Sequence, residues 1–409
     1  MFYFESSVFF CQVDSFRAFK DYQKNGRCVR LLAVPEYQFS QSSVESELGV
    51  QVISIEVSYW EFYRLAYGNG RVPAKSVRDK IDILDEDVEE RSKWYRLEVD
   101  WNAPHRHGYA YPTFGDDEPR FFELLSCSAA IEKLSLAPAP LVENKLLVVG
   151  ERPEGVMFNN NESNWTLSAF HVGQGMCSIV SNGNEAILLD VGAGTPVTRG
   201  LYQKNKIDND LAKVIEGVAF IDIVLSHADQ DHWRILAWDA NLRKKIRHIF
   251  VPEGAKSLAF KDPSIRMDIK EVNRLTFSLS AGSRIEVYRS KPSRNDDNGH
   301  CLISTFENKG KKALIAGDYV YDRFRTDANS DVKALVNEEF DAVVVPHHGD
   351  DESAFGIFKA RDGAVAFFSA GDHKGFGHPT ATSRDNHILA NYREICDNLC
   401  GDIKVVELI

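Results

Sequence analysis

The strongest chemical signal in the sequence is a group of four side chains that commonly bind metals. His227, Asp229, Asp231 and His232 follow directly on the apolar run of residues 220–225. In an extended chain, side chains two positions apart lie on the same side, so one imidazole and two carboxylates can meet at one cation. His232 can approach that cation from the start of the next helix. The alternative is a polar turn between strand and helix in which Asp231 is only the helix N-cap.

Further Asp and His residues follow other predicted strands. They are Asp190, Asp318, His347, His348 and His378. A single Asp or His after a strand is more often a turn former or a helix cap. Together with the group at 227–232, however, these residues predict a pocket for two metal ions at one edge of a β-sandwich.

In such a pocket the residues would have different tasks. Asp318 is the natural carboxylate to bridge two metals, and a water held between the metals would be acidic enough to attack a phosphorus or carbonyl centre at neutral pH. Asp190 is expected to orient a ligand histidine through a hydrogen bond, because metal-bound imidazoles commonly need such a partner.

The elements that position these residues are short strands with few helices between them. Apolar runs with period two predict strands, and they cover residues 165–172, 177–180, 186–189, 220–225, 246–251, 301–306, 313–316, 341–345, 364–368 and 403–408. A helix is predicted near residues 209–215. A long connection without a predicted strand joins residue 251 to residue 300. Asp and His residues recur at the ends of the strands.

Residues 1–155 are predicted to form a separate small α+β module. Strand patterns at residues 8–13, 28–34 and 50–57 are separated by polar, turn-rich pieces. The polar stretch of residues 150–164 has no hydrophobic period and is taken as the domain boundary. The module has no catalytic motif, so we expect it to serve recognition or regulation through a protein partner.

The composition is that of a globular protein, with 44% hydrophobic and 26% charged residues. The formal net charge of −12 argues against broad binding to polyanions, so any contact with nucleic acid must be local. Seven cysteines without regular spacing favour a reducing cytosol. No apolar stretch approaches the length of a membrane span, and the N-terminus lacks a signal-peptide pattern. We therefore expect a cytoplasmic protein without a membrane anchor, of undetermined oligomeric state.

Several of these motifs occur in the order found in a known family. The run 227–232, with Asp190 before it and Gly317-Asp318 after it, resembles the metallo-β-lactamase superfamily. The finer resemblance is to the hydrolase domain of ComEC-type DNA-uptake proteins, on the motifs Phe170-His-Val-Gly-Gln-Gly175, Leu225-Ser-His-x-Asp-x-Asp-His232, Val345-Pro-His-His-Gly349 and Ser369-x-Gly…Gly377-His-Pro379. The resemblance covers residues 165–409. It implies the fold class α/β, as a metallo-β-lactamase αββα sandwich preceded by the N-terminal α+β module.

The resemblance also implies roles for the candidate residues. The implied metal ligands are His227, Asp229, Asp231, His232, Asp318 and His347. The implied catalytic residues are Asp231, His348, Lys374 and His378. Because of the order of their loops, the last three would supply the leaving oxygen with a proton or a positive charge. Asp190 and Asn298 are expected to contact ligands rather than the metal.

The chain departs from the family pattern at two places that affect the metal. The usual second histidine of the motif is Asp229, as in the ComEC-type subgroup. No histidine clearly fills the third motif, for which Asp297, Asn298 and His300 are the candidates. A carboxylate in place of an imidazole shifts the preference of the site from zinc toward harder ions. We therefore expect two divalent metal ions, Mn²⁺ or Zn²⁺, with Mg²⁺ as the alternative.

Three functions are compatible with these motifs. The first is a metal-dependent phosphodiesterase, a soluble nuclease acting on DNA in bacterial defence, with phosphate contacts from Lys244, Lys245, Arg247, Lys291, Arg294 and Lys374. The second is a hydrolase of a cyclic nucleotide, a small phosphodiester or a lactone, which the acidic net charge and Asp350-Asp351 favour. The third is a scaffold with a vestigial site, which the intact ligand set disfavours.

Overall fold

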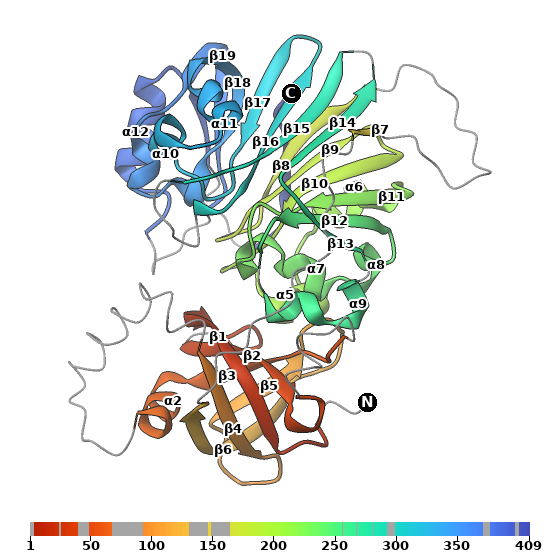
Figure 1. Ribbon diagram of the computed structural model, residues 1–409, viewed down its shortest axis with the longest axis vertical. Coiled ribbons are helices and arrows are strands. Elements are labelled where there is room, and N and C mark those ends of the chain that lie inside the picture. The colour runs from red at the N-terminus through yellow and green to blue at the C-terminus, as the bar shows by residue number, and fades with distance from the viewer. Residues whose placement is uncertain are drawn as a thin grey trace. The chain divides into compact units, whose positions relative to one another are not determined.

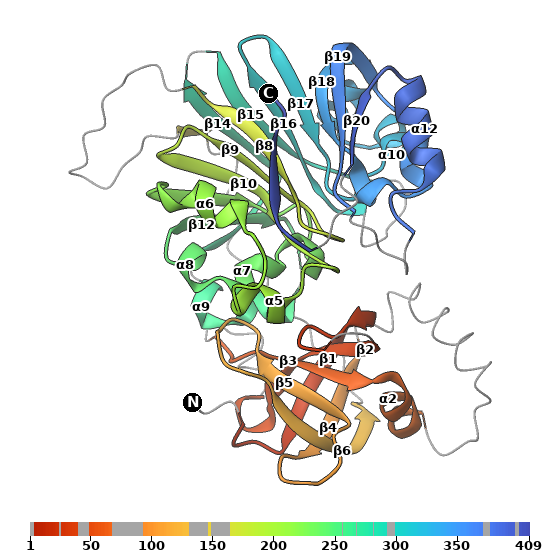
Figure 2. The ribbon, with the colours of Figure 1, turned by 180° about the vertical axis from the view of Figure 1, so that it is seen from behind.

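The computed structural model (Figure 1; Figure 2 from behind) shows two compact units. It describes residues 4–23, 26–39, 49–67, 93–130, 146–148, 164–255, 257–266, 268–280, 282–292, 299–370, 377–396 and 401–409. Unit 1 comprises Met1–Ala137, Ala237–Ala240 and Lys256–Met267, and unit 2 comprises Pro138–Leu236, Asn241–Ala255 and Asp268–Ile409. The predicted boundary at residues 150–164 lies outside the described residues, except for Asn164.

Unit 2 contains two mixed β-sheets. The first has the strand order β13 (Ile269–Val272), β12 (Ile246–Pro252), β11 (Phe220–Val224), β10 (Glu185–Val191), β9 (Cys177–Ser181), β8 (Thr166–His171) and β21 (Lys404–Glu407). Strands β10 to β13 are parallel to one another, whereas β8, β9 and β21 pair antiparallel.

The second sheet has the strand order β20 (Arg393–Cys396), β19 (Lys359–Phe368), β18 (Glu339–Val344), β17 (Lys311–Ile315), β16 (Leu302–Asn308), β15 (Ser283–Arg289), β14 (Arg274–Ser280) and β7 (Leu146–Val148). Strands β17 to β20 are parallel. The predicted hairpin at residues 301–316 corresponds to β16 and β17. In both sheets, therefore, a parallel half is extended by strands that pair antiparallel, except that β7 pairs parallel with β14.

Alternate residues of the central strands face two different cores. Ala313 and Ile315 of β17 lie in the core between the sheets, together with Leu189 of β10. Leu314, between them in the chain, lies in a second core that includes Phe324 of a covering helix. Neighbouring strand residues point to opposite faces, so one strand serves both cores. Each fully buried Leu or Phe contributes about 1.5–3 kcal/mol.

Helices cover the outer faces of the two sheets. On the second sheet these are α10 (Tyr321–Thr326), α11 (Ser330–Ala334) and α12 (Ala381–Leu389), and α6 (Asp210–Glu216) lies on the first (Figure 2). Between residues 164 and 409 the structure also describes α5 (Arg199–Gln203), α7 (Arg234–Trp238), α8 (Ala240–Arg243) and α9 (Pro263–Arg266), of which α9 belongs to unit 1. Unit 2 is therefore an αββα sandwich, and the predicted α/β fold class is confirmed. No helix among the described residues has the length and apolar character needed to cross a membrane.

The connection between residues 251 and 300 contains three strands, β13, β14 and β15, so its prediction as strand-free is wrong. Leu275 and Phe277 of β14, and Ile285 and Val287 of β15, are buried in the core between the sheets. They alternate with polar residues, so a period-two pattern was present. These strands extend both sheets beyond the elements that carry the candidate ligands.

Unit 1 is a closed β-barrel. Its strand order is β1 (Val8–Phe19), β2 (Arg27–Pro35), β3 (Ile53–Ser58), β5 (Gly108–Pro112), β6 (Arg120–Ala129) and β4 (Trp94–Asp100), which pairs with β1 again. Helix α2 (Tyr59–Ala66) follows Ser58, whose hydroxyl accepts a hydrogen bond from the Glu61 amide, a favoured N-cap arrangement. Phe62 and Tyr63 of α2 pack into the barrel core.

A buried ionic cluster lies on the face of β2 and β3 opposite the barrel core. Arg30 Nη2 lies 2.9 Å from Asp21 Oδ1 and 2.7 Å from Glu56 Oε1, and the Tyr111 hydroxyl lies 2.9 Å from an oxygen of each carboxylate. Burial alone would lower the pKa of Arg30, but Asp21 and Glu56 hold it well above its usual value. The cluster thus joins β2, β3 and β5 through one guanidinium and two carboxylates.

Replacing a buried leucine and an exposed leucine with alanine is expected to change the free energy of unfolding by very different amounts. Leu314→Ala removes a side chain that is fully buried, whereas Leu389→Ala acts on a side chain that is 79% exposed. We expect Leu314→Ala to lower the free energy of unfolding by about 2–5 kcal/mol and Leu389→Ala to change it by less than about 0.5 kcal/mol. Urea titration followed by far-UV circular dichroism measures both. Equal effects would contradict the described packing.

Candidate metal centre

The candidate ligands lie where parallel strands of both sheets end. Asp190 is near the end of β10, and the others follow strands: His227 after β11, Asp318 after β17, His347 and His348 in the 3₁₀ turn η6 (Pro346–Gly349) after β18, and His378 after β19. Strands β10 and β11 are parallel, as are β17 to β19. Ligands of α/β proteins commonly bind at such carboxyl ends. The two sheets thus contribute to one site.

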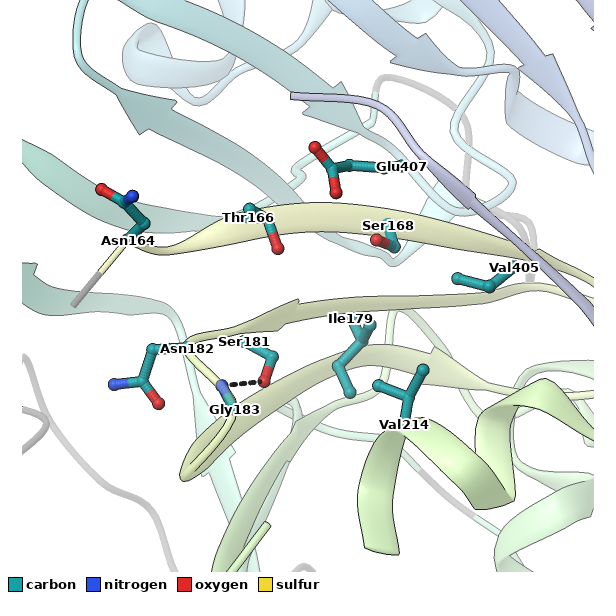
Figure 3. Close-up of a pocket in the computed structure, with 10 residues that line it drawn as sticks. All are labelled: Asn164, Thr166, Ser168, Ile179, Ser181, Asn182, Gly183, Val214, Val405 and Glu407. Atoms are coloured by element: carbon teal, nitrogen blue, oxygen red, sulfur yellow. Dashed lines mark hydrogen bonds between the residues drawn. The ribbon is translucent and has the colours of Figure 1, made fainter. Parts of the chain in front are cut away.

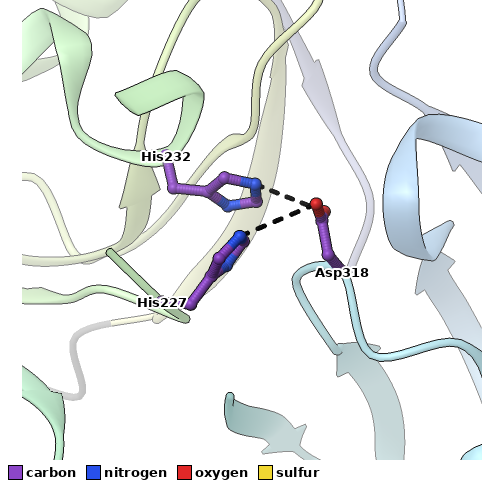
Figure 4. A group of neighbouring side chains, drawn as sticks. All are labelled: His227, His232 and Asp318. Carbon is purple, nitrogen blue, oxygen red and sulfur yellow. Dashed lines mark ion pairs between the residues drawn. The ribbon is translucent and has the colours of Figure 1, made fainter. Parts of the chain in front are cut away.

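The centre of the site is a buried trio. His227, His232 and Asp318 offer ligand atoms that lie within 4.8 Å of one another. Asp318 Oδ1 is 3.2 Å from His232 Nε2, and Asp318 Oδ2 is 3.7 Å from His227 Nε2 (Figure 4). Among the described residues, neither Nε2 atom nor Asp318 Oδ1 has a hydrogen-bond partner. Buried polar atoms without partners are costly, so this donor set fits a divalent metal ion.

A second group of possible ligands adjoins the trio. Asp231, His232 and His348 also bring ligand atoms within 4.8 Å of one another. Asp231 Oδ2 lies 3.0 Å from His348 Nε2 and 4.0 Å from His232 Nε2, and His348 Nε2 lies 4.0 Å from Asp318 Oδ1. The two groups share His232. His348, which the sequence analysis assigns to catalysis, therefore also belongs to a group of possible ligands.

The remaining candidates lie at the margin of these groups. Asp229 Oδ2 is 3.7 Å from His227 Nε2, and His347 Nε2 is 3.9 Å from Asp318 Oδ2. His378 lies beside the histidine pair, with its ring centroid 6.1 Å from that of His347. Lys374, Asn298 and Asp297 lie outside the described residues. His300, the third candidate for the missing motif, has Nδ1 2.9 Å from Arg289 Nη2.

Oxygen atoms lie within hydrogen-bond distance of Nδ1 in four of the histidines. Nδ1 of His227 lies 3.0 Å from Ser226 Oγ, and Nδ1 of His232 lies 2.9 Å from Asp190 Oδ2. Nδ1 of His347 lies 2.9 Å from Asp350 Oδ2, and Nδ1 of His348 lies 2.9 Å from the Ser369 main-chain oxygen. Asp190 Oδ1 also accepts from the Ser226 amide, at 2.6 Å. Partners of this kind fix the ring orientation of metal-binding histidines and set the tautomer that leaves Nε2 for the metal.

The backbone at the site is unusual. Asp190, His347 and His348 have φ values of 58°, 48° and 57°, in the left-handed region that costs non-glycine residues about 1–3 kcal/mol each. Glycines permit the close approach of neighbouring turns: a Cβ atom on Gly192 would overlap the Asp231 main chain, and one on Gly317 would overlap Ser226. Strained residues of this kind cluster at functional sites.

The pKa values reflect the crowding of carboxylates and imidazoles. Burial would raise the pKa of Asp318, but His232 and His347 hold it well below the usual value. Burial and His227 would lower the pKa of His232, but Asp318 and Asp190 hold it well above. In the same way, Asp318 and Asp350 outweigh burial and raise the pKa of His347 to about 9. The carboxylates therefore attract positive charge, whether protons or a metal.

The sequence analysis did not assign a role to four residues that contact the candidate histidines. These are Ser226, Asp350, Ser369 and Gln174, whose Nε2 lies 3.3 Å from His378 Nδ1. Each occurs within or next to a motif that carries the family resemblance. Proximity to a motif was thus a usable signal, but the atoms they contact depend on the folded structure.

A groove of about 370 Å³ lies elsewhere on unit 2, on the face of β8, β9 and β21 that α6 adjoins (Figure 3). Hydroxyl and amide side chains and a few apolar ones line it: Asn164, Thr166, Ser168, Ile179, Ser181, Asn182, Val214, Val405 and Glu407. It contains none of the candidate ligands and a single carboxylate. It is therefore separate from the metal centre.

An αββα sandwich with histidines and aspartates at its strand ends is the metallo-β-lactamase fold. No protein-family model and no curated protein matches this chain. Among solved structures, the chain is similar to human tRNase Z, short form (13% identity, TM-score 0.35, 59% of this chain and 99% of that chain), the metallo-β-lactamase fold protein YhfI from Bacillus subtilis (11%, 0.36, 59% and 99%) and yeast PDE1 (12%, 0.35, 60% and 100%). The finer ComEC-type resemblance stays a prediction.

We expect Asp318→Asn to weaken the binding of divalent metal more than about 100-fold, beyond the 10–100-fold typical of residues that only support a ligand. The reason is that the amide loses the charge that both histidines face. Calorimetric titration with Mn²⁺ and Zn²⁺ measures the affinity. Asp362→Asn, the same change at an exposed position of β19, is the matched control. Because bound metal must displace protons from the histidines, affinity should rise with pH through neutrality.

Asp190→Asn tests the support of His232. The carboxylate accepts from both the Ser226 amide and His232 Nδ1, whereas an amide offers only one acceptor atom for these two donors. We expect metal affinity to fall about 10–100-fold with the fold intact by circular dichroism. Unchanged affinity would show that His232 does not need this partner.

Proposed function

We propose that unit 2 is a metal-dependent phosphodiesterase and that its substrate is DNA. The observation that carries this proposal is the buried trio His227, His232 and Asp318, whose ligand atoms converge without hydrogen-bond partners among the described residues. A divalent metal bound there supplies Lewis acidity, which lowers the pKa of water and offsets negative charge at phosphorus. The acceptors at Nδ1 orient the rings before substrate arrives, so little reorganisation is needed during the reaction.

The donor set supports the choice of metal. Asp231, Asp318 and the neighbouring Asp229 provide oxygen atoms, and the histidines provide nitrogen. Mixed oxygen and nitrogen ligands suit Mn²⁺ as well as Zn²⁺, while an all-oxygen set would suit Mg²⁺. Because two ligand groups share His232, we propose two ions, Mn²⁺ first and Zn²⁺ second.

Contacts with the DNA backbone have to come from a few basic residues. Lys245 Nζ donates to the main-chain oxygens at the end of α6, within 2.6–2.9 Å, and Arg247 pairs with the buried Asp222. These two side chains are thus used within the protein. The proposal relies instead on Lys244 and Lys291, and on Arg294 and Lys374 outside the described residues.

A small phosphodiester, such as a cyclic nucleotide, is the second candidate substrate. Asp350 beside His347 adds a carboxylate to a site that already contains Asp229, Asp231 and Asp318. Carboxylates near the site repel a polyanion more than a single phosphodiester.

For the DNA-directed activity we further propose a cytoplasmic role in defence against foreign DNA, in which unit 1 contacts a protein partner.

The test is cleavage of labelled single-stranded and double-stranded DNA with Mn²⁺, Zn²⁺ or Mg²⁺, in parallel with bis(p-nitrophenyl) phosphate and a cyclic dinucleotide. We expect metal-dependent cleavage of DNA that falls at least about 10²-fold in Asp231→Asn, because His348 and His232 then lose their shared carboxylate. Asp362→Asn should cleave like wild type.

Two outcomes would overturn parts of the proposal. Cleavage of the small diesters without cleavage of either DNA would replace DNA by the second candidate. If protein that calorimetry shows to be loaded with metal cleaves none of these substrates, the proposed phosphodiesterase activity is wrong.

A further inference from the structure

Two arginines of unit 1 carry positive charges that no described carboxylate compensates. Elsewhere, ion pairs with Asp or Glu engage Arg30, Arg64, Arg96, Arg247, Arg274, Arg284, Arg323, Arg361 and Arg384. Arg106 and Arg120 are exposed, and neither has an ion pair among the described residues. Their charges are therefore available to an anionic ligand.

Both guanidinium groups lie over aromatic rings. Cζ of Arg106 lies 4.6 Å from the ring centroid of Phe121, and Cζ of Arg120 lies 5.2 Å from that of Trp101. Arg120 also has Nη1 3.5 Å from the Phe4 main-chain oxygen. A cation–π contact holds a guanidinium over a ring and leaves most of its N–H donors unused. These donors are the groups that bind phosphate oxygens.

The two rings under the arginines are fixed by the barrel. The Phe121 ring lies 5.8 Å from that of Tyr109, and the Trp101 ring lies 5.6 Å from that of Phe122, in edge-to-face arrangements. Tyr109 and Phe122 are buried. Trp101 Nε1 also donates to the Ser6 main-chain oxygen, at 2.8 Å. Both rings nevertheless remain partly exposed, so they form a rigid surface for a flat ligand group.

Two histidines extend this surface along the connection between β4 and β5. The rings of His105 and His107 lie 6.2 Å apart and are nearly parallel, at 12°. The Leu124 amide donates to His107 Nδ1 at 3.2 Å, which holds the connection against β6, and His105 is exposed. We call Trp101, His105, Arg106, Arg120 and Phe121 the basic aromatic surface.

This combination of groups matches the chemistry of a single-stranded nucleic acid. Guanidinium groups bind its phosphates, and partly exposed aromatic rings stack on its bases. The bases of a duplex are already stacked on one another, so a duplex would use the charges alone. Exposed carboxylates of Asp116 and Asp117 precede Arg120 in the chain and repel phosphates. They limit the surface to a short contact, as the net charge of −12 requires.

We propose that the basic aromatic surface of unit 1 binds single-stranded DNA. An acidic protein segment would also pair with the two arginines, but it would leave the rings without a stacking partner. The choice of DNA over RNA rests on the function proposed above for unit 2. The binding itself needs neither metal nor cleavage, and it leaves the other surfaces of unit 1 open to a protein partner.

The first experiment measures binding without cleavage. Fluorescence anisotropy of a labelled strand of about 12 thymidines is followed with the full chain in EDTA. We expect Arg106→Gln with Arg120→Gln to weaken binding about 10-fold near 0.1 M salt. The slope of log K against log salt should become shallower by about 1.4, because each phosphate contact with a single strand contributes about 0.7.

Arg96→Gln is the matched control for this experiment. Arg96 belongs to the same barrel, but its Nη2 lies 3.2 Å from Glu36 Oε1, so its charge is already paired and binding should match wild type. Absence of binding by wild type in EDTA would overturn the proposal. Unchanged affinity and salt slope in the double variant would overturn it as well, because the strand would then bind elsewhere.

The second experiment identifies the ligand class. Phe121→Leu removes the ring beneath Arg106 and should weaken binding of the strand about 10-fold, because the base loses its stacking partner; thermal unfolding shows whether this variant is folded. We expect a duplex of equal length to bind at least about 10-fold more weakly than the strand. Equal affinity would overturn the stacking contact.

Competition with two other polymers completes the test. Poly-L-glutamate that displaces the strand at equal charge concentration would assign the surface to an acidic protein and overturn the proposal. Tighter binding of oligouridine than of oligothymidine would replace DNA by RNA.

The outcomes separate this inference from the function on which the choice of DNA rests. If metal-loaded wild type cleaves no phosphodiester but the double variant loses binding in EDTA, the surface stands and the proposed function fails. If DNA is cleaved but the double variant binds it like wild type, the function stands and this inference fails.

Discussion

The site depends on one buried carboxylate between two buried imidazoles. Asp318 follows a strand of the second sheet, and His227 and His232 follow a strand of the first. The two sheets are therefore joined by these ion pairs as well as by their shared hydrophobic core. A charge in such surroundings is costly unless it is paired. Without a cation, the carboxylate and the imidazole stabilise each other's charged form, which raises the pKa of His232 and lowers that of Asp318. A divalent ion satisfies all three at once.

The backbone around the trio is built to bring these groups together. Asp190, His347 and His348 adopt left-handed φ values, and Gly192 and Gly317 allow turns from different strands to touch. Strain of about 1–3 kcal/mol at each such residue is offset by the two hydrophobic cores of unit 2, in which central strands are buried on both faces. A well-packed sandwich can therefore maintain a site that an isolated loop could not.

Local sequence patterns predicted what depends on local chemistry. The group at 227–232 stood out because ligand types and an apolar strand occur together, and the αββα fold followed from the order of the motifs and is confirmed. Strands β13 to β15 were missed although Leu275 and Phe277 alternate correctly, because short alternating runs do not differ enough from a loop. The closure of the barrel and the internal pairing of Arg247 with Asp222 depend on contacts between distant segments. No spacing in the sequence expresses such contacts.

The same limit applies to the histidines themselves. In the sequence, His348 and His378 are equivalent: each follows a strand and precedes a turn. In the folded chain, Nδ1 of His348 lies against the Ser369 main-chain oxygen and Nδ1 of His378 against the side-chain amide of Gln174. The contact that each ring makes is therefore a property of the folded chain and not of the spacing of the histidines in the sequence.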